Sequence, residues 1–321
     1  MIIFTLTRIA GDPIAVYAGP QATAQQLAEI TREYGFNQPI YVQYLYYVKG
    51  LLHGDLGYSV TAGLPVNVAI ERFFPATLEL AIYATLFSII VGIYLGTKSA
   101  VHRNRPIDHG ARMTALVGAS IPSFWLGLVL IFLFYFEFGI LGPGRLSPTI
   151  IQTYFPPNGN FHTYTGLLTV DAILNLNFPV FINAVEHLIL PVITLGLVNT
   201  AIIARITRSS MLESMQQDYV KYARAKGLPE NDVISNHARR NALIPVTTVA
   251  GLTLAMTLTG SVLIENVFDW PGVGRWAAQA ALALDHAAVL GFVIFVAVIY
   301  ILVNLIVDII YAYIDPRIKL Q

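Results

Sequence analysis

Five long apolar runs constrain the fold of this chain more than any other feature. An α-helix needs roughly 20 apolar residues to cross the hydrocarbon core of a bilayer, and each run is about that long. Apolar residues make up 55% of the chain and charged residues only 12%, whereas soluble domains carry about 25% charged residues. We therefore expect an all-α integral membrane protein, a polytopic helical bundle. The runs are Ala76–Thr97, Met113–Phe136, His187–Ile206, Ala242–Ile264 and Val289–Ala312.

Lysine and arginine residues are concentrated in alternate connections between these runs, and this pattern orients the spans. Cytoplasmic connections of membrane proteins are enriched in Lys and Arg. The segments around Lys98–Arg112, Arg205–Arg240 and Pro316–Gln321 are therefore expected to be cytoplasmic. The connections expected outside are residues 10–75, 138–186 and 265–288.

This orientation raises a question at the N-terminus. Residues 10–75 are expected outside, yet only Met1–Ile9 precede them, which is too short to cross a bilayer. The run Ile2–Ile9 is apolar apart from two Thr and Arg8. We expect it to be the last part of a first span whose beginning is missing, through an overlooked upstream start codon or through truncation.

The region before the first full run contains signals for short helices. Thr23 is placed to cap a helix that ends near Gly35, and Pro39 begins a second helical stretch that runs to Leu52. Gly54-Asp55-Leu56-Gly57 predicts a turn. The tyrosines of the second stretch suit a position along the membrane interface.

The basic segment Asp218–Pro245 lies between two apolar runs and has small residues at its centre. Ala223 and Gly227 are four positions apart, so they are expected to share one helix face that another protein could approach closely. Gly227 is also expected to end that helix in a left-handed conformation, with Pro229 preventing its continuation. The alternative is an ordinary basic loop on the cytoplasmic side.

A small, polar face is predicted in the fourth of these runs, Ala242–Ile264. Its residues recur at helical spacing and could line a wide, weakly polar transport path. Close packing of helices in lipid is the alternative, because small residues also serve that purpose. The candidates are Thr248, Gly251, Thr253, Thr257, Gly260 and Ser261.

Several kinds of chemistry have no support in the sequence. The chain has no Cys, which excludes disulfides, thiolate catalysis and Cys-ligated metals. Gly96-Thr97-Lys98 lacks the glycine spacing of a phosphate-binding loop. His237 and His286 have no further ligands at metal-binding spacing, so no metal site is expected. The formal net charge is zero, and no nucleic-acid partner is expected.

Short motifs occur in order along nearly the whole chain. They are Gly11-Asp12-Pro13, Tyr34 to Pro39, Val42 to Tyr44, Gly54 to Gly57, Pro75 to Leu80, Ile121 to Phe124, His187 to Pro191, Tyr222 to Leu228, His237 to Ala242, Phe268 to Arg275 and Tyr311 to Arg317. Together they resemble the motifs of permease subunits of ATP-binding-cassette (ABC) importers, in the dipeptide/oligopeptide/nickel group. General importers have Glu-Ala-Ala where this chain has Lys221-Tyr222-Ala223, and the peptide-type branch commonly lacks that Glu.

The resemblance implies a type I ABC importer transmembrane fold with five full spans and a truncated-looking first span. It divides the chain into three parts. Residues 1–75 would hold the first-span remnant and external interfacial helices, residues 76–312 the transmembrane domain, and residues 313–321 a cytoplasmic tail. The transmembrane domain would include a coupling loop at 208–241 and an external excursion at 138–186. The residues implied in coupling to the ATPase are Tyr222, Ala223, Arg224, Ala225, Lys226, Gly227 and Leu228.

The resemblance also implies the partners and the transport mode. The chain would be a multi-pass protein of the cytoplasmic membrane, without enzymatic activity or a cofactor of its own. It would pair with a second permease subunit, most simply as a heterodimer. Two cytoplasmic ABC ATPases would bind ATP and Mg, and an extracellular or periplasmic binding protein would deliver the cargo. Peptides are the expected cargo, with oligosaccharides or nickel as alternatives. An ATP-independent secondary transporter or channel is the alternative of another class.

Overall fold

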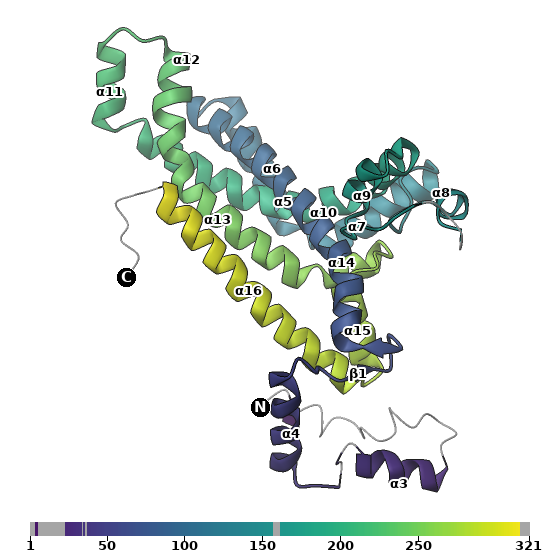
Figure 1. Ribbon diagram of the computed structural model, residues 1–321. Coiled ribbons are helices and arrows are strands. Elements are labelled where there is room, and N and C mark those ends of the chain that lie inside the picture. The colour runs from purple at the N-terminus through teal and green to yellow at the C-terminus, as the bar shows by residue number, and fades with distance from the viewer. Residues whose placement is uncertain (1–3, 6–22, 34, 36, 157–160, 315–321) are drawn as a thin grey trace. The chain divides into compact units, whose positions relative to one another are not determined.

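The computed structural model describes residues 4–5, 23–33, 35, 37–156 and 161–314 (Figure 1). These residues form two compact units. The first unit comprises the described residues up to Thr77 together with Pro271–Val298. The second unit comprises Leu78–Trp270 and the described residues from Ile299 onward. The expected first-span remnant lies outside the described residues, apart from Phe4 and Thr5, which are helical.

The first unit contains short helices and a small hairpin packed around one apolar cluster. Val66, Trp276 and Ala288 are fully or almost fully buried at the centre of this cluster. The strands pair antiparallel, with Tyr58 opposite Pro65. The elements are α3 (Ala24–Glu33), α4 (Ile40–Leu52), β1 (Tyr58–Ser59), β2 (Leu64–Pro65), the first turns of α5 (Val66–Val101), α15 (Val273–Leu282) and the first part of α16 (His286–Ile314).

The signals for short helices in the first unit are confirmed. The Thr23 hydroxyl accepts a hydrogen bond from the Gln26 amide, and the Gln26 side chain accepts one from the Thr23 amide. These reciprocal bonds form a capping box that begins α3. Pro39 precedes α4, and Gly54 and Gly57 both have positive φ in the predicted turn.

The second unit is organised around the long helix α10 (Phe178–Ser214), which contacts α6, α7, α9 and α13. In Figure 1, α13 runs beside α10. The remaining elements are α6 (Pro106–Ser120), α7 (Ser123–Ile131), the π-helix η1 (Phe132–Glu137), α8 (Pro148–Tyr154), α9 (Leu168–Leu174), α11 (Asp218–Ala225), α12 (Glu230–Asp232), the π-helix η2 (Val233–Ala238), α13 (Arg239–Gly260) and α14 (Val262–Val267).

Glycines allow α5 and α10 to approach closely within this unit. A Cβ on Gly96 would lie 2.6 Å from the Ala204 carbonyl oxygen, and one on Gly196 would lie 2.4 Å from the Phe87 ring. Ser88 donates a hydrogen bond to the Gly196 carbonyl oxygen across the same contact. Small residues thus bring the two helix backbones together, as is common in membrane helices.

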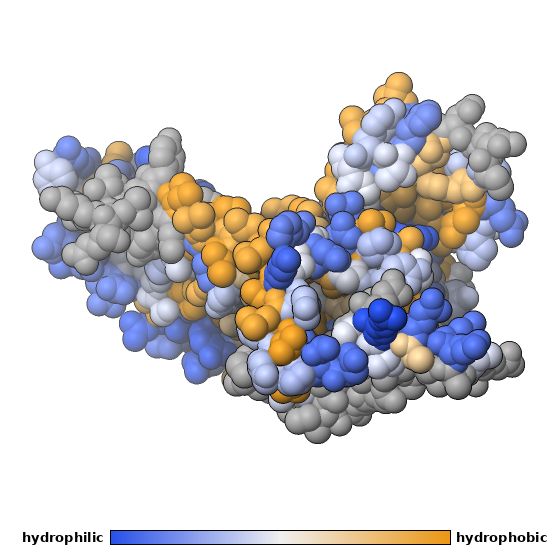
Figure 2. Space-filling model, turned by 60° about the horizontal axis from the view of Figure 1, so that its bottom comes forward, coloured by the Kyte–Doolittle hydropathy of each residue, from blue (hydrophilic) through white to orange (hydrophobic). Residues whose placement is uncertain are grey.

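Among the described residues, four helical segments are long and apolar enough to cross a membrane: Val66–Val101, Phe178–Ser214, Glu230–Leu258 and His286–Val307. Large apolar side chains such as Ile90, Met256 and Ile301 are exposed on these segments. Figure 2 shows broad exposed areas of apolar residues in orange. The chain is therefore a multi-pass membrane protein, as predicted.

The predicted span Met113–Phe136 falls on two helices that are long and apolar enough to cross a membrane only when taken together. Its two halves, Pro106–Ser120 and Ser123–Glu137, are bent by 96° at the break between them. Ile121, at the break, has an extended backbone with φ −82° and ψ 126°. The ring of a proline clashes with the preceding residue and disfavours a helical backbone there. Ile121 precedes Pro122, so the helix ends before it.

Candidate functional site

The coupling segment begins with α11 and ends in the predicted glycine cap. Gly227 has φ +78°, and its amide donates a hydrogen bond to the Arg224 carbonyl oxygen. The Leu228 amide is bonded to the Ala223 carbonyl oxygen in the same turn. Such bonds to the last carbonyl groups, with a left-handed glycine, terminate a helix. The predicted cap at Gly227 is confirmed, and Glu230 begins α12 after Pro229.

The predicted shared helix face of Ala223 and Gly227 is wrong. Helix α11 ends at Ala225, so Gly227 lies beyond it in the turn. Ala223 is buried and belongs to a cluster with Met211 and Val233. Its small side chain therefore lets α11 pack onto its own unit. Gly227 is exposed, and a Cβ there would meet no atom within 4 Å.

The opposite side of α11 and the turn after it form an exposed surface, called here the outer surface: Tyr222, Arg224, Ala225, Lys226, Gly227 and Leu228. The Tyr222 side chain is 63% exposed, and the Lys226 ammonium lies 4.7 Å from the centre of its ring. Arg224 donates two hydrogen bonds to the Glu230 carboxylate, at 2.7 and 3.1 Å. The carboxylate raises the pKa of Arg224, and the pair fixes the turn between α11 and α12.

A buried ion pair joins α10 to α6 near the coupling segment. The Arg208 guanidinium donates to both oxygens of the Asp108 carboxylate, each at 2.8 Å. Asp108 is fully buried and also accepts from the Ser99 hydroxyl of α5. Three helices therefore meet at one carboxylate. This contact cannot be read from the sequence, because 100 residues separate Arg208 from Asp108.

The threonines predicted to line a path are buried in the second unit. Thr253 and Thr257 are each 5% exposed. The Thr257 hydroxyl donates to the Thr253 carbonyl oxygen and accepts from the Asn199 side chain of α10, at 3.2 Å. Ser261 donates to the Glu265 carboxylate at 2.7 Å. The hydroxyls of Thr257 and Ser261 are thus bonded to Asn199 of α10 and to Glu265 of α14, within this chain.

The other candidates for the path lie elsewhere on α13. Thr248 and Gly251 line a cavity of about 260 Å³ whose lining is almost wholly apolar. A Cβ on Gly251 would lie 2.1 Å from a methyl carbon of Val307, so α13 packs closely on α16 there. Gly260 ends α13, and its surroundings lie outside the described part of the structure. A role of these six residues in transport stays a prediction.

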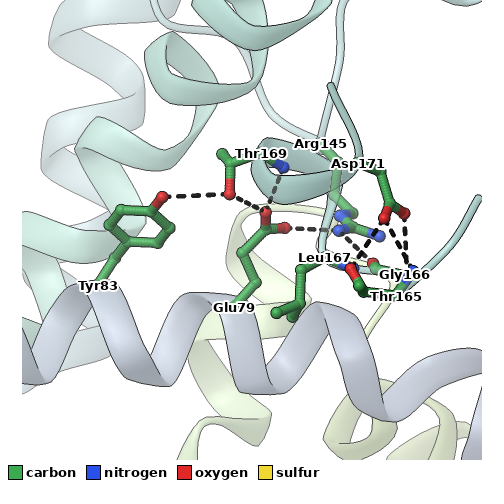
Figure 3. A network of polar contacts seen from close by, with 8 residues as sticks. All are labelled: Glu79, Tyr83, Arg145, Thr165, Gly166, Leu167, Thr169 and Asp171. Carbon is green, nitrogen blue, oxygen red and sulfur yellow. Dashed lines mark hydrogen bonds and ion pairs between the residues drawn. The ribbon is translucent and has the colours of Figure 1, made fainter. Parts of the chain in front are cut away.

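A second polar network attaches a connecting segment to α5 (Figure 3). Glu79, only 2% exposed, accepts hydrogen bonds from the Thr169 amide and hydroxyl, both at 2.7 Å. Arg145 donates to Glu79 at 2.5 Å and to the Gly166 carbonyl oxygen at 3.0 Å. Asp171 accepts from the amides of the loop around Thr165. The segment at 138–186 is thus held by a buried charge pair.

Neither network resembles a catalytic or metal centre. In each, an arginine neutralises one buried carboxylate, Glu79 or Asp108, which also accepts hydrogen bonds from neighbouring groups. Within the part of the chain that the structure describes, no three His, Asp or Glu side chains lie close enough together to hold a metal ion.

Similar proteins were found by sequence. Curated relatives include the probable D,D-dipeptide transport system permease protein of Escherichia coli strain K12, 48% identical over 97% of this chain and 89% of that protein. The dipeptide transport system permease protein of the same strain is 42% identical over 97% of this chain and 91% of that protein. The oligopeptide transport system permease protein of Bacillus subtilis strain 168 is 35% identical over 99% of this chain and 93% of that protein.

A solved structure and two family models agree with these relatives. A chain of the inward-facing methionine ABC transporter matches with a TM-score of 0.53 at 15% identity, over 77% of this chain and 96% of that chain. The fold is therefore the type I ABC importer transmembrane fold, as expected. The model of the N-terminal region of binding-protein-dependent transport system membrane components matches residues 1–81. Because a second model matches residues 88–320, the chain belongs to the family of binding-protein-dependent transport system inner membrane components.

Proposed function

We propose that this chain is the permease subunit of an ATP-driven peptide importer and forms half of the path through the membrane. Three relatives with 35–48% identity are named for the transport of D,D-dipeptides, dipeptides or oligopeptides. They align over nearly the whole chain, which supports a shared cargo class. Oligosaccharides and nickel are the alternative cargoes.

The observation that carries the ATP-driven part is the outer surface of the coupling segment. It combines an exposed aromatic ring, Tyr222, with cations and an exposed apolar side chain, Leu228. Aromatic residues and Arg are enriched at protein interfaces relative to the rest of the protein surface. Val220 and Ala223, on the inner side of α11, are buried. A displacement of α11 by a partner would therefore be transmitted through these packed contacts to the rest of the second unit.

The proposed transporter needs several partners besides this chain. Two cytoplasmic ATPase subunits would bind ATP and Mg and contact the outer surface. A second permease subunit would complete the path, and an external binding protein would deliver the cargo. The proposed location is the cytoplasmic membrane, with the coupling segment on the cytoplasmic side.

In this mechanism, closure of the ATPases pushes α11. Because α11 packs on Met211 at the end of α10 and on Val233 of η2, the push reaches α10 and α13 together. The Asp108–Arg208 pair then makes α6 and α5 follow α10. ATP binding would thereby favour one of two arrangements of the spans over the other.

Uptake by the complete reconstituted transporter tests this proposal. The binding protein, both permeases and the ATPases would be placed in proteoliposomes with ATP inside or outside the vesicles as the orientation requires. We expect uptake of a labelled dipeptide that stops when ATP is omitted. Uptake of an oligosaccharide or nickel without dipeptide uptake would replace the proposed cargo, and dipeptide uptake by this chain without ATP would contradict the ATP-driven mechanism.

A further inference from the structure

A cavity of about 380 Å³ lies between α5, α6 and α10 in the second unit. Ser209, in the last turns of α10, lines it, and α11 begins shortly after α10 ends. The cavity is therefore near the coupling segment along the chain. Three arginines line it, Arg112 on α6 and Arg205 and Arg208 on α10, and no Asp or Glu is among its lining residues.

The positive charge in this cavity is only partly neutralised by the chain. Arg208 is paired with the buried carboxylate of Asp108. Among the described residues, Arg112 and Arg205 make no ion pair. Two guanidinium groups that share one cavity repel each other, and a phosphate between them would accept hydrogen bonds from both. The cavity thus has the charge of an anion site.

The remaining walls are apolar. Leu95 of α5 and Leu116 of α6 line the same cavity, and Leu116 is 56% exposed. Met113 and Val117, on either side of Leu116, are also largely exposed. An adjoining pocket of about 400 Å³ shares Leu95 and Ala111 and adds Lys98 and Tyr94. Cations and exposed apolar groups therefore lie side by side on α5 and α6.

We propose that this cavity binds the phosphate of an anionic phospholipid, with the acyl chains lying against the apolar side chains of α6 and α5. A free phosphate would satisfy the arginines but leave Leu116 and its neighbours exposed. A lipid covers both kinds of surface. Basic pockets between helices on the cytoplasmic side of a membrane favour anionic headgroups. The inference rests on the proposed membrane orientation, which places these arginines at the cytoplasmic surface.

Anionic rather than zwitterionic lipid is expected because of the composition of the lining. The ammonium of a zwitterionic headgroup is stabilised by a negatively charged group nearby. Asp108 is fully buried and already bonded to Arg208, Ser99 and the Asn104 amide. No carboxylate among the lining residues is available for the ammonium.

The test is lipid binding to the complete transporter, purified in detergent and titrated with phosphatidylglycerol or phosphatidylcholine under native mass spectrometry. The variant is Arg112→Gln with Arg205→Gln. The matched control is Arg103→Gln with Arg105→Gln, which removes the same charge from exposed positions outside the cavity. We expect the cavity variant to bind phosphatidylglycerol roughly 30-fold more weakly. The control and the affinity for phosphatidylcholine should stay within about twofold of the wild type.

Several results would overturn the proposal. Equal phosphatidylglycerol binding by the cavity variant and the control would place the lipid elsewhere. Displacement of the lipid by millimolar inorganic phosphate would identify a site for free anions. Loss of the second permease subunit from the cavity variant would show that a protein partner occupies the cavity.

Two further measurements distinguish loss of the lipid site from misfolding of the variant and from failure of the proposed transport function. Arg112→Lys with Arg205→Lys should keep most of the phosphatidylglycerol affinity, which a misfolded variant would not. ATP-driven dipeptide uptake by the wild type tests the proposed function without reference to bound lipid. A transporter that takes up dipeptide but shows no preference for phosphatidylglycerol would contradict this inference and leave the proposed function standing.

Discussion

At the scale of single residues, two buried carboxylates each accept from an arginine distant in sequence. Glu79 pairs with Arg145, and Asp108 pairs with Arg208. A charge taken out of water is unfavourable unless it is paired and hydrogen-bonded, and both carboxylates also accept bonds from other groups. In the sequence, Glu79 lies in the Pro75 to Leu80 motif and Arg145 in the connection 138–186, and nothing local links the two.

Removing Arg145 should destabilise the protein more than removing both partners. Arg145→Gln leaves the buried Glu79 carboxylate without its cation, and we expect a loss of about 3 kcal/mol in the free energy of unfolding. Glu79→Gln with Arg145→Gln leaves a neutral pair and should lose less. Thermal unfolding in detergent measures both. Glu79→Gln alone completes the comparison, and a loss in the double variant equal to the sum of the two single losses would show that the two residues do not stabilise each other.

Substitution of Gly227 separates a role as a helix cap from a role in contact with the ATPase. Alanine at φ +78° should strain the turn by about 1–2 kcal/mol, although space for its Cβ is open. Asparagine tolerates a left-handed conformation better. If Gly227 allows close approach of the ATPase, both variants should reduce uptake per ATP hydrolysed. Normal uptake per ATP with Gly227→Asn would show that Gly227 only ends the helix and is not needed for contact with the ATPase.

At the scale of elements, contact between α5 and α10 depends on glycines at particular positions. A Cβ on Gly96 would meet the backbone oxygen of Ala204, which cannot move away as a flexible side chain could. Gly110, on α6, faces open space. The two residues therefore form a matched pair for the same substitution.

We expect Gly96→Ala and Gly110→Ala to change stability in opposite directions. Gly96→Ala should lower the free energy of unfolding by about 1–3 kcal/mol through overpacking. Gly110→Ala should raise it by up to about 1 kcal/mol, because alanine favours a helix. Thermal unfolding in detergent compares them. A destabilisation by Gly110→Ala as large as that by Gly96→Ala would contradict the close packing of α5 on α10.

The bend after α6 shows what hydrophobic periodicity leaves out at this scale. The apolar residues of Met113–Phe136 continue through Ile121 and Pro122, so their number and length predict one span. The local preference of the residue before proline divides this run into two helices. The α11 cap was predictable for the opposite reason, because Gly227 and Pro229 act on their own backbone and need no distant partner.

At the scale of the whole molecule, the sequence predicted the class, the family and where the long apolar segments lie. Apolar runs and short motifs are local, and they carry this information directly. Contacts between distant residues were beyond its reach, as Arg208 with Asp108 and Asn199 with Thr257 illustrate. The inward orientation of Ala223 was missed because α11 packs on its own unit, which spacing along one helix does not reveal.

The central claim, that the outer surface of the coupling segment binds an ATPase, is tested most directly by copurification. The tagged chain would be expressed with the complete transport system, as wild type, as Tyr222→Ala with Leu228→Ala, and as the control Arg103→Ala. We expect the wild type and the control to retain an ATPase subunit. The double variant should retain at least tenfold less, because exposed aromatic anchors contribute about 2 kcal/mol or more to such interfaces. Equal retention of the ATPase by the double variant and the wild type would contradict the claim.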